Sequence, residues 1–394
     1  MNLLYMGYFC NEGLFDRLVE SGSKSSHARQ QLETKLLNGL IEVLGEKKLE
    51  MISYLPLMNK DIVAEFGKDE IYRGVNVRYL WCDKQNIFSL LQAFYRNLIY
   101  IRQWAAGKES KVVLTYSSNP LHVIPLLLLK KIYKIKIVTL CSEVSDFRRK
   151  EGISFIGRIS RKVSSFLENS FDGYVLLSKY MNEVINKKCR PYIVMEGIAG
   201  EVSEEEEIEK KYAVLYAGGL TEDNGIMILL DGFVQAAIEG LELWICGDGP
   251  LINVVKKYDK QYRNIHYYGL ISNQYVQRME REAELLIAPR ISKNHFTKYS
   301  FPSKTIEYMA SGTPTVLTRL KGIPEEYFDY TYVLEDETVE GISGCLREIF
   351  HQERAERKEF GKKAQKFVLE NKNSYVQAEK ILHFLKNEYG KTEK

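Results

Sequence analysis

A lysine and a glutamate stand three residues apart in the segment SFPSKTIEYMASGTPTV, residues 300–316. Proline and serine just before the pair favour a helix start, and the Gly-Thr-Pro sequence after it favours a helix end. Lys304 would then lie in the first helical turn, where an anionic ligand such as a pyrophosphate would explain a cation. Glu307, one turn later on the same face, could accept hydrogen bonds from the vicinal hydroxyls of a ribose. A solvated ion pair explains the spacing equally well.

Two glycine-rich turns follow predicted strands upstream of this segment. Gly218 and Gly219 precede a predicted helix over 224–233, whose free N–H groups could hold a phosphate, and Gly247 lies in a second turn, CGDGP. Either turn could be an ordinary strand-to-helix connection. The dinucleotide fingerprint GxGxxG and the P-loop pattern are both absent, so these turns alone define no ligand.

The elements that must position these residues alternate between apolar strands and helical patterns along the whole chain. This alternation predicts an α/β fold with parallel sheets. An acidic segment at 200–211 interrupts it and is typical of a solvated linker. We therefore predict an N-terminal domain over 1–199 and a C-terminal domain over 200–373. A terminal helix over 374–394 should pack back on the first domain.

Composition and charge exclude several classes of protein. The 394 residues are 45% hydrophobic and carry a net charge of only +3, which gives no general argument for nucleic-acid binding. Six scattered cysteines without a CxxC pair argue against a thiolate zinc site and a disulfide framework. The longest apolar run, VIPLLLL at 123–129, is too short to span a bilayer, and no signal-peptide pattern opens the sequence. We expect a cytoplasmic protein.

Positive charge is concentrated in one part of the first half. Between residues 111 and 165 there are eleven Lys or Arg and three Asp or Glu. The segment 147–167 interleaves these cations with Phe, Ile and Val, as in helices that bind an anionic membrane surface. An ordinary surface helix packed on the sheet would show a similar pattern.

Taken together, the segments YAGGL, ICGDGP and SFPSKTIEYMASGTPTV resemble the retaining glycosyltransferases of the group 1, or family 4, class. Within that class the sequence is similar to bacterial enzymes of surface-polysaccharide synthesis, such as capsule or exopolysaccharide. The resemblance implies the GT-B fold, in which two Rossmann-like domains face each other across a cleft. It also implies transfer of a hexose from a nucleotide diphosphate sugar, for example a UDP-sugar, to a lipid-linked or glycan acceptor. No cofactor is implied.

The resemblance also assigns donor-binding residues. Glu307 matches the glutamate that holds the nucleotide ribose. The other positions expected near the donor sugar and phosphates are Ser300, Phe301, Pro302, Ser303, Gly218, Gly219 and Gly247.

Three positions depart from the family pattern. Tyr299 replaces a first glutamate, and Gly219 and Asn224 stand where the family places its phosphate-binding Arg and Lys. Lys304 is therefore our candidate for the phosphate cation. Lys298 and Arg290 are weaker candidates for the same phosphate contact.

The acceptor side is less defined. Two strands of the first half end in TYSSNP (115–120) and CSEVSDF (141–147), which should face the cleft. Glu143 is the preferred acid to orient an acceptor hydroxyl, with Asp146 second, although either could be a structural cap. No DxD sequence occurs, so we predict no metal requirement. Two alternatives stay open, a non-catalytic GT-B subunit that supports an active partner and a nucleotide-sugar epimerase.

Overall fold

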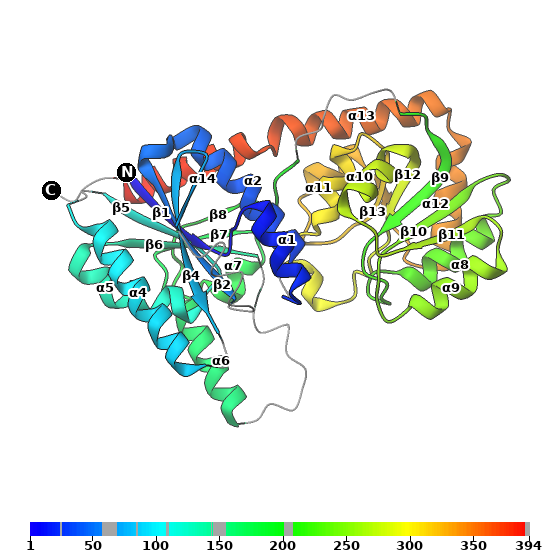
Figure 1. Ribbon diagram of the computed structural model, residues 1–394. Coiled ribbons are helices and arrows are strands. Elements are labelled where there is room, and N and C mark those ends of the chain that lie inside the picture. Colours follow the sequence, from blue (N-terminus) through cyan, green and yellow to red (C-terminus); the bar gives the residue numbers. More distant parts are fainter. Residues whose placement is uncertain are drawn as a thin grey trace. The chain divides into compact units, whose positions relative to one another are not determined.

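The computed structural model shows two compact α/β units (Figure 1). Unit 1 consists of Met1–Ile198 with Ser374–Lys394, and unit 2 consists of Ala199–Asn373. Each unit has a parallel sheet with helices on both sides, which confirms the predicted α/β class with two Rossmann-like domains. The structure describes residues 1–23, 26–56, 69–83, 86–107, 110–142, 144, 155–200 and 208–390, without the side chains of 47, 155–161 and 295.

The sheet of unit 1 has eight strands in the order β3-β4-β2-β1-β5-β6-β7-β8. Every pairing is parallel except that of β3 with β4. The order reverses at β1, which lies between β2 and β5, and such a reversal leaves a crevice at the carboxyl ends of the strands. The strands are β1 (Asn2–Gly7), β2 (Leu49–Pro56), β3 (Glu70–Tyr72), β4 (Val75–Cys82), β5 (Lys111–Tyr116), β6 (Lys136–Cys141), β7 (Gly173–Leu176) and β8 (Tyr192–Val194).

Helices cover both faces of this sheet. The chain runs from β4 through β5 and β6 to β7 in one direction, so right-handed crossovers place the three connecting helices on one face. The connection from β1 to β2 runs the other way and places α2 on the opposite face, where α14 packs against it (Figure 1). The helices are α1 (Glu12–Glu20), α2 (His27–Leu44), α4 (Ile87–Ala105), α5 (Pro120–Tyr133), α6 (Phe155–Glu168), α7 (Met181–Ile185) and α14 (Ser374–Tyr389), with a 3-10 turn η1 (Glu46–Lys48).

The last helix is an integral part of unit 1. The hydroxyl of Tyr389 donates to the carbonyl of Asp172 at 2.8 Å, and the Gln377 amide donates to the carbonyl of Gly197 at 2.9 Å. Gly39 of α2 lets the backbone of α14 approach closely, because a Cβ there would lie 2.0 Å from the carbonyl oxygen of Ser374. The return of the terminal helix to the first half was predicted from the sequence, and α14 spans the helical segment 374–389.

The sheet of unit 2 has six strands, all parallel, in the order β11-β10-β9-β12-β13-β14. The order reverses between β9 and β12. The strands are β9 (Lys211–Ala217), β10 (Glu242–Cys246), β11 (Ile265–Gly269), β12 (Ala283–Ala288), β13 (Thr315–Thr318) and β14 (Tyr332–Leu334). The helices are α8 (Ile226–Ala236), α9 (Ile252–Gln261), α10 (Asn273–Glu282), α11 (Ser303–Ala310), α12 (Val339–His351) and α13 (Arg354–Asn371), with 3-10 turns η3 (His295–Tyr299) and η4 (Glu325–Tyr330).

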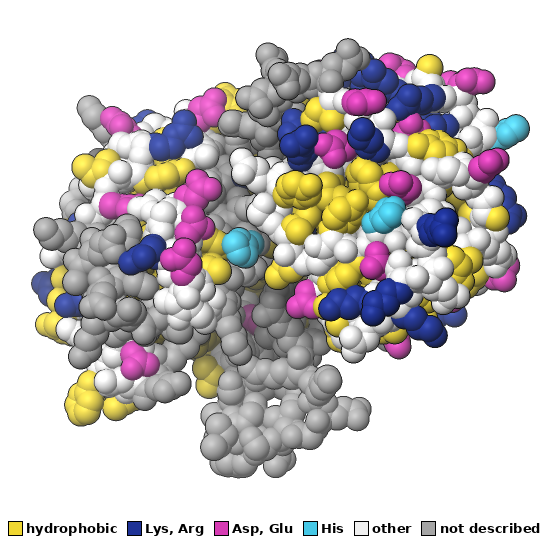
Figure 2. Space-filling view, turned by 45° about the vertical axis from the view of Figure 1, so that its right-hand side comes forward, with side chains coloured by type: hydrophobic (Ala, Val, Ile, Leu, Met, Phe, Trp, Pro, Cys, Tyr) yellow, Lys and Arg dark blue, Asp and Glu magenta, His cyan; other side chains and the backbone are white. Residues whose placement is uncertain are grey.

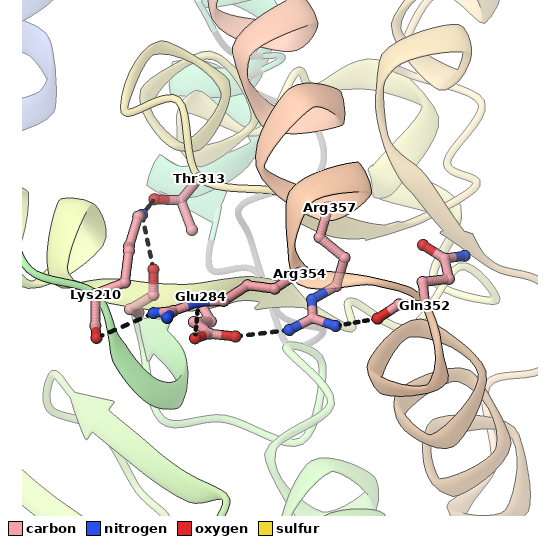
Figure 3. A network of polar contacts seen from close by, with 7 residues as sticks. Lys210, Glu284, Thr313, Gln352, Arg354 and Arg357 are labelled. Atoms are coloured by element: carbon pink, nitrogen blue, oxygen red, sulfur yellow. Dashed lines mark hydrogen bonds and ion pairs between the residues drawn. The ribbon is translucent and has the colours of Figure 1, made fainter.

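A buried ionic network fixes α13 to the amino end of β12 (Figure 3). The carboxylate of Glu284 lies 2.7 Å from the guanidinium groups of both Arg354 and Arg357. Lys210 donates to the carbonyl of Ala283, and burial lowers the pKa of its ammonium to about 8. The network lies at the end of the sheet opposite the strand carboxyl ends, so we interpret it as structural. Removing Glu284 would leave the buried charge of Arg357 without its carboxylate partner.

The surface of unit 2 carries both signs of charge. On the face that Figure 2 shows, Lys and Arg side chains in dark blue are interspersed with Asp and Glu side chains in magenta, around a group of hydrophobic side chains. This face therefore presents no extended field of a single sign.

Candidate functional site

A pocket of about 300 Å³ opens at the carboxyl ends of β9, β12 and β13 in unit 2. This is where the strand order of the sheet reverses, the usual location of a ligand in an open α/β sheet. Its wall is built from the turn after β9, the residues after β12, the start of α11 and the end of β13. The lining residues are Tyr216, Ala217, Gly218, Gly219, Asn224, Ala288, Arg290, Phe301, Pro302, Ser303, Lys304, Thr305, Tyr308, Leu317, Thr318, Leu320 and Ile323.

The turn after β9 is held in place from within. The Tyr216 hydroxyl and the Asn224 amide each donate to the carbonyl of Gly219 at 2.8 Å. Asn224, which replaces a cation of the family pattern, thus fixes the turn. Gly247 does not line the pocket but lies behind it, where a Cβ would be 1.9 Å from the carbonyl oxygen of Gly218. Its φ of +134° also requires glycine.

The amino end of α11 forms the pocket wall. The helix begins at Ser303 after Pro302, as predicted, and no side chain caps it. Its first-turn N–H groups therefore lack a side-chain acceptor, and an anion in the pocket could accept from them. The hydroxyl of Thr305 is buried there without a hydrogen-bond partner in the described part of the chain. At the other end of α11, the Tyr308 hydroxyl accepts from the backbone N–H of Ala217 at 2.8 Å and so ties the helix to β9.

Lys304 lies between two carboxylates. Its ammonium is 2.8 Å from Glu307 and 3.6 Å from Glu280 of α10. Burial lowers the pKa of Lys304, but the two carboxylates and their hydrogen bonds outweigh burial, so the pKa is raised. The side chain of Lys304 is 28% exposed and that of Glu280 only 3%. The pair predicted from the sequence is therefore a partly buried cluster of three charges, in which much of the lysine charge is already balanced.

Arg290 is the second cation of the pocket and has much less compensation. It follows β12, and its guanidinium lies 5.4 Å from the centre of the Phe296 ring. Its Nε is buried without a hydrogen-bond partner, and within the described residues the side chain forms no ion pair. Burial lowers the pKa of the guanidinium, and the charge of Asp223 opposes this only in part. A partly buried guanidinium that forms no ion pair is suited to an anionic ligand.

The other residues predicted at the donor site are divided by the structure. Phe301, Pro302 and Ser303 line the pocket together with the glycines of the β9 turn. Ser300, Lys298 and Glu307 do not line it, and the Lys298 ammonium lies 4.6 Å from the centre of the Tyr299 ring. The Ser300 hydroxyl is buried without a hydrogen-bond partner among the described residues.

Sequence reasoning missed the part of the wall beyond α11, formed by Thr318, Leu320 and Ile323. No motif marks these residues. Their one signal is that Thr318 ends β13 and Leu320 and Ile323 follow it, so they lie at the carboxyl edge of the sheet.

Unit 1 has a polar cluster at its own strand reversal, at the carboxyl ends of β1 and β5. The Arg29 guanidinium stacks 4.4 Å from the centre of the Tyr8 ring, and the Asn119 amide donates to the Tyr8 hydroxyl at 3.0 Å. Beside them, Glu33 of α2 is fully buried and accepts from the Tyr5 hydroxyl at 2.7 Å and the Tyr8 N–H at 2.9 Å. Burial raises the pKa of Glu33 to about 7, although these hydrogen bonds and Arg29 oppose the shift. The sequence patterns did not mark this cluster.

The predicted catalytic acids Glu143 and Asp146 lie outside the described residues, as does the segment 147–154. The remainder of the predicted basic stretch, 155–167, falls within α6. No group of three or more His, Cys, Asp or Glu side chains in the described ranges could hold a metal ion. None of the described helices is both long and apolar enough to cross a membrane.

Comparison with solved structures defines the fold as GT-B. HepE of Anabaena, solved in complex with UDP, superposes with a TM-score of 0.65 at 10% identity, over 98% of this chain and 100% of HepE. Sucrose-phosphate synthase of Thermosynechococcus elongatus gives 0.64 at 14% identity, over 99% and 100%. The lipopolysaccharide outer core galactosyltransferase WaaB gives 0.59 at 14% identity, over 98% and 99%. At such identities the likeness is one of fold.

The family comparison adds the class of chemistry. Residues 211–351, which form most of unit 2 and include the pocket, match the family described as glycosyl transferases group 1. No curated protein matches the sequence significantly. The family match and the GT-B fold together support a glycosyltransferase, as the sequence predicts.

Proposed function

We propose that the pocket of unit 2 binds a nucleotide diphosphate sugar, and that the protein transfers the sugar to a lipid-linked or glycan acceptor. One observation supports a nucleotide diphosphate sugar as the donor. The guanidinium of Arg290, which forms no ion pair among the described residues, and the uncapped amino end of α11 line the same pocket. A cation and a helix amino end in one small cavity suit a diphosphate.

Three charged residues would share the donor. Arg290 would carry the larger part of the diphosphate charge, because Lys304 is already paired with Glu307 and Glu280. Lys304 would support the second phosphate. Glu307 does not line the pocket itself, but it lies 2.8 Å from the Lys304 ammonium in the wall, and there it would accept hydrogen bonds from the ribose hydroxyls. The glycines of the β9 turn and the loop 300–303 would let the backbone approach the sugar.

The reaction would rest on positioning and on stabilising the departing diphosphate. We expect retention of the anomeric configuration and no metal requirement, as the resemblance and the absence of a DxD sequence imply. Glu143, or else Asp146, would orient the acceptor hydroxyl.

The setting that we propose is bacterial polysaccharide synthesis in the cytoplasm, at the inner face of the membrane, with 147–167 as one contact. One similar structure supports polysaccharide synthesis by its name alone, since WaaB is named as a lipopolysaccharide galactosyltransferase. HepE, solved with UDP-glucose, supports only the class of donor.

The donor site is tested by calorimetric titration of UDP and uridine into the wild type and two variants. Arg290→Ala should weaken UDP binding about ten- to a hundredfold and leave uridine binding nearly unchanged, because a charge-assisted contact contributes about 1.5–3 kcal/mol. Lys304→Ala should weaken UDP binding less. The matched control is Arg319→Ala, whose guanidinium pairs with Glu325 and Glu335 outside the pocket.

Equal affinities of the wild type and Arg290→Ala for UDP would contradict the phosphate assignment. A larger loss from Lys304→Ala than from Arg290→Ala would reverse the two roles. Acceptor-dependent release of UDP from a UDP-sugar separates a transferase from the two alternatives. A non-catalytic subunit would bind UDP without turnover, and an epimerase would convert the donor without an acceptor.

A further inference from the structure

The outer surface of the helical layer α4–α5–α6 is unusually apolar for a face whose side chains remain exposed among the described residues. On α5, Ile124, Leu128 and Ile132 recur every fourth residue and so form one stripe. Their exposed fractions are 36%, 57% and 72%, whereas Val123 and Leu126 on the other side of the helix are fully buried. One face of α5 therefore packs on the sheet, and the other presents aliphatic side chains outward.

The neighbouring helix α4 carries a second stripe. Phe88, Leu91 and Tyr95 are spaced by three and four residues and are 78%, 58% and 65% exposed. In the same helix Trp104 and Ile101 are buried. Helices α4 and α5 pack side by side on one face of the sheet (Figure 1).

The third helix of the layer continues the pattern on the other side of α5. Val163 and Phe166 of α6 are 41% and 66% exposed. Soluble surfaces usually show single exposed apolar residues, whereas grouped ones mark an interaction site. With Ile87 of α4, which is 61% exposed, nine large apolar side chains are exposed on these three helices among the described residues, and this grouping marks the layer as an interaction site.

The charges of the same helices indicate which partner fits. The sequences of α4, α5 and α6 contain seven Lys or Arg and a single acid, Glu168 at the end of α6. Arg96, Arg102 and Lys131 are exposed beside the apolar stripes. A second copy of this chain seated on the layer would bring two sets of cations together. An anionic lipid surface offers both an apolar interior and complementary charge.

We propose that the layer α4–α5–α6 binds the surface of an anionic membrane, with the stripes of α4 and α5 inserted below the headgroups. The two stripes lie outside the segment 147–167, so the contact extends over a whole helical layer. Long basic side chains beside the stripes would reach up to the headgroups while their stems cover apolar surface. The inference deepens the proposed function, because it relies on that function for the lipid-linked acceptor, but vesicle binding can be measured without any sugar transfer.

The test is sedimentation of the full chain with vesicles of phosphatidylcholine, with and without phosphatidylglycerol. The triple variant Phe88→Ser, Leu128→Ser, Ile132→Ser should bind phosphatidylglycerol vesicles at least about a hundredfold more weakly, because inserting each side chain is worth roughly tenfold or more. All three side chains are more than half exposed, so the fold should persist. Leu270→Ser is the matched control, since Leu270 is 80% exposed on unit 2.

The charge contribution is tested separately. Arg96→Gln, Arg102→Gln and Lys131→Gln should each weaken binding to phosphatidylglycerol vesicles about fivefold at low salt. They should have little effect on phosphatidylcholine vesicles.

Three results would overturn the proposal. These are a wild type that does not sediment with either vesicle, a triple variant that binds like the wild type, and an equal loss in Leu270→Ser. A wild-type dimer that the triple variant converts to a monomer, with vesicle binding unchanged, would assign the layer to a second copy instead. Titration of UDP into the same variants keeps the two hypotheses apart. Failure of UDP binding in the wild type would contradict the donor site and leave the vesicle result standing.

Discussion

At the scale of single residues, the two cations of the pocket show why charge alone does not identify a phosphate ligand. Lys304 and Arg290 are both partly buried at the same cavity, yet Lys304 has two carboxylates within 4 Å and Arg290 has an aromatic ring. The sequence located Lys304 through its helix and kept Arg290 only as a reserve. The sequence could not show that Glu280 is the second partner of Lys304, because Glu280 lies in α10, more than twenty positions upstream.

Glu33 gives the protein a pH dependence of known sign. Burial raises its pKa to about 7 in the folded protein, from an ordinary value of 4.5 for a glutamate. Between these pH values the folded state holds a proton that the unfolded state has lost, so the free energy of unfolding falls as pH rises and becomes level above about 7. The loss amounts to about 3 kcal/mol.

Glu33→Gln should remove this slope, because the amide cannot ionise and its oxygen still accepts from Tyr5 and Tyr8. Urea denaturation of both proteins across this pH range measures it. The exposed Glu42 of the same helix provides the control substitution, Glu42→Gln, which should keep the wild-type slope. Parallel pH profiles for Glu33→Gln and the wild type would show that Glu33 ionises normally in the folded protein.

At the scale of elements, the helices predicted best were those whose apolar residues recur with one clear helical period. The helix predicted near Pro302 or Ser303 is α11, and the terminal helix predicted from residue 374 is α14. The short strands β3 and β14, of three residues each, show no periodicity in the sequence. For α5 no buried face could be predicted from the sequence. Its run VIPLLLL is apolar on every side, so only the packing reveals that Ile124, Leu128 and Ile132 point outward.

The packing of α14 on α2 depends on one glycine. Gly39→Ala should lower the free energy of unfolding of unit 1 by about 1–3 kcal/mol, because the new Cβ would overlap the carbonyl of Ser374. Gly344 of α12 is the matched control, since a Cβ there would meet nothing within 4 Å. Gly344→Ala should raise stability by up to about 1 kcal/mol through helix propensity. Guanidinium denaturation checks both, and a stabilised Gly39→Ala would mean that the two helices separate without cost.

At the scale of the whole molecule, the two units differ in how the chain builds them. Unit 2 is one continuous segment, Ala199–Asn373, whereas unit 1 needs both ends of the chain. The sequence predicted the two α/β halves and the return of the terminal helix, but not the order of the strands in either sheet. The pocket walls come from four separate segments of unit 2. Pocket residues could therefore be predicted from the sequence only in the segments that carry a motif.

A chain ending at Asn373 should therefore lose unit 1 selectively. The deleted helix α14 contributes the buried side chains of Ile381, Leu382 and Leu385 in the full chain. Burial of each stabilises the fold by about 1.5–3 kcal/mol, and the sum is comparable to the stability of a whole domain. Hydrogen exchange should show loss of protection in α2 and β1, with protection retained in β9 and β12. Continued protection of α2 would mean that unit 1 folds without its last helix.

The place of α14 in unit 1 has a consequence for synthesis on the ribosome. Domains usually fold in the order in which they emerge. Here the first 198 residues must wait, without their closing helix, while the whole of unit 2 is translated. Unit 2 can fold as soon as Asn373 has left the exit tunnel, so the part of the protein made second is completed first. During that interval the face of α2 that α14 will cover is open to chaperones or to other nascent chains.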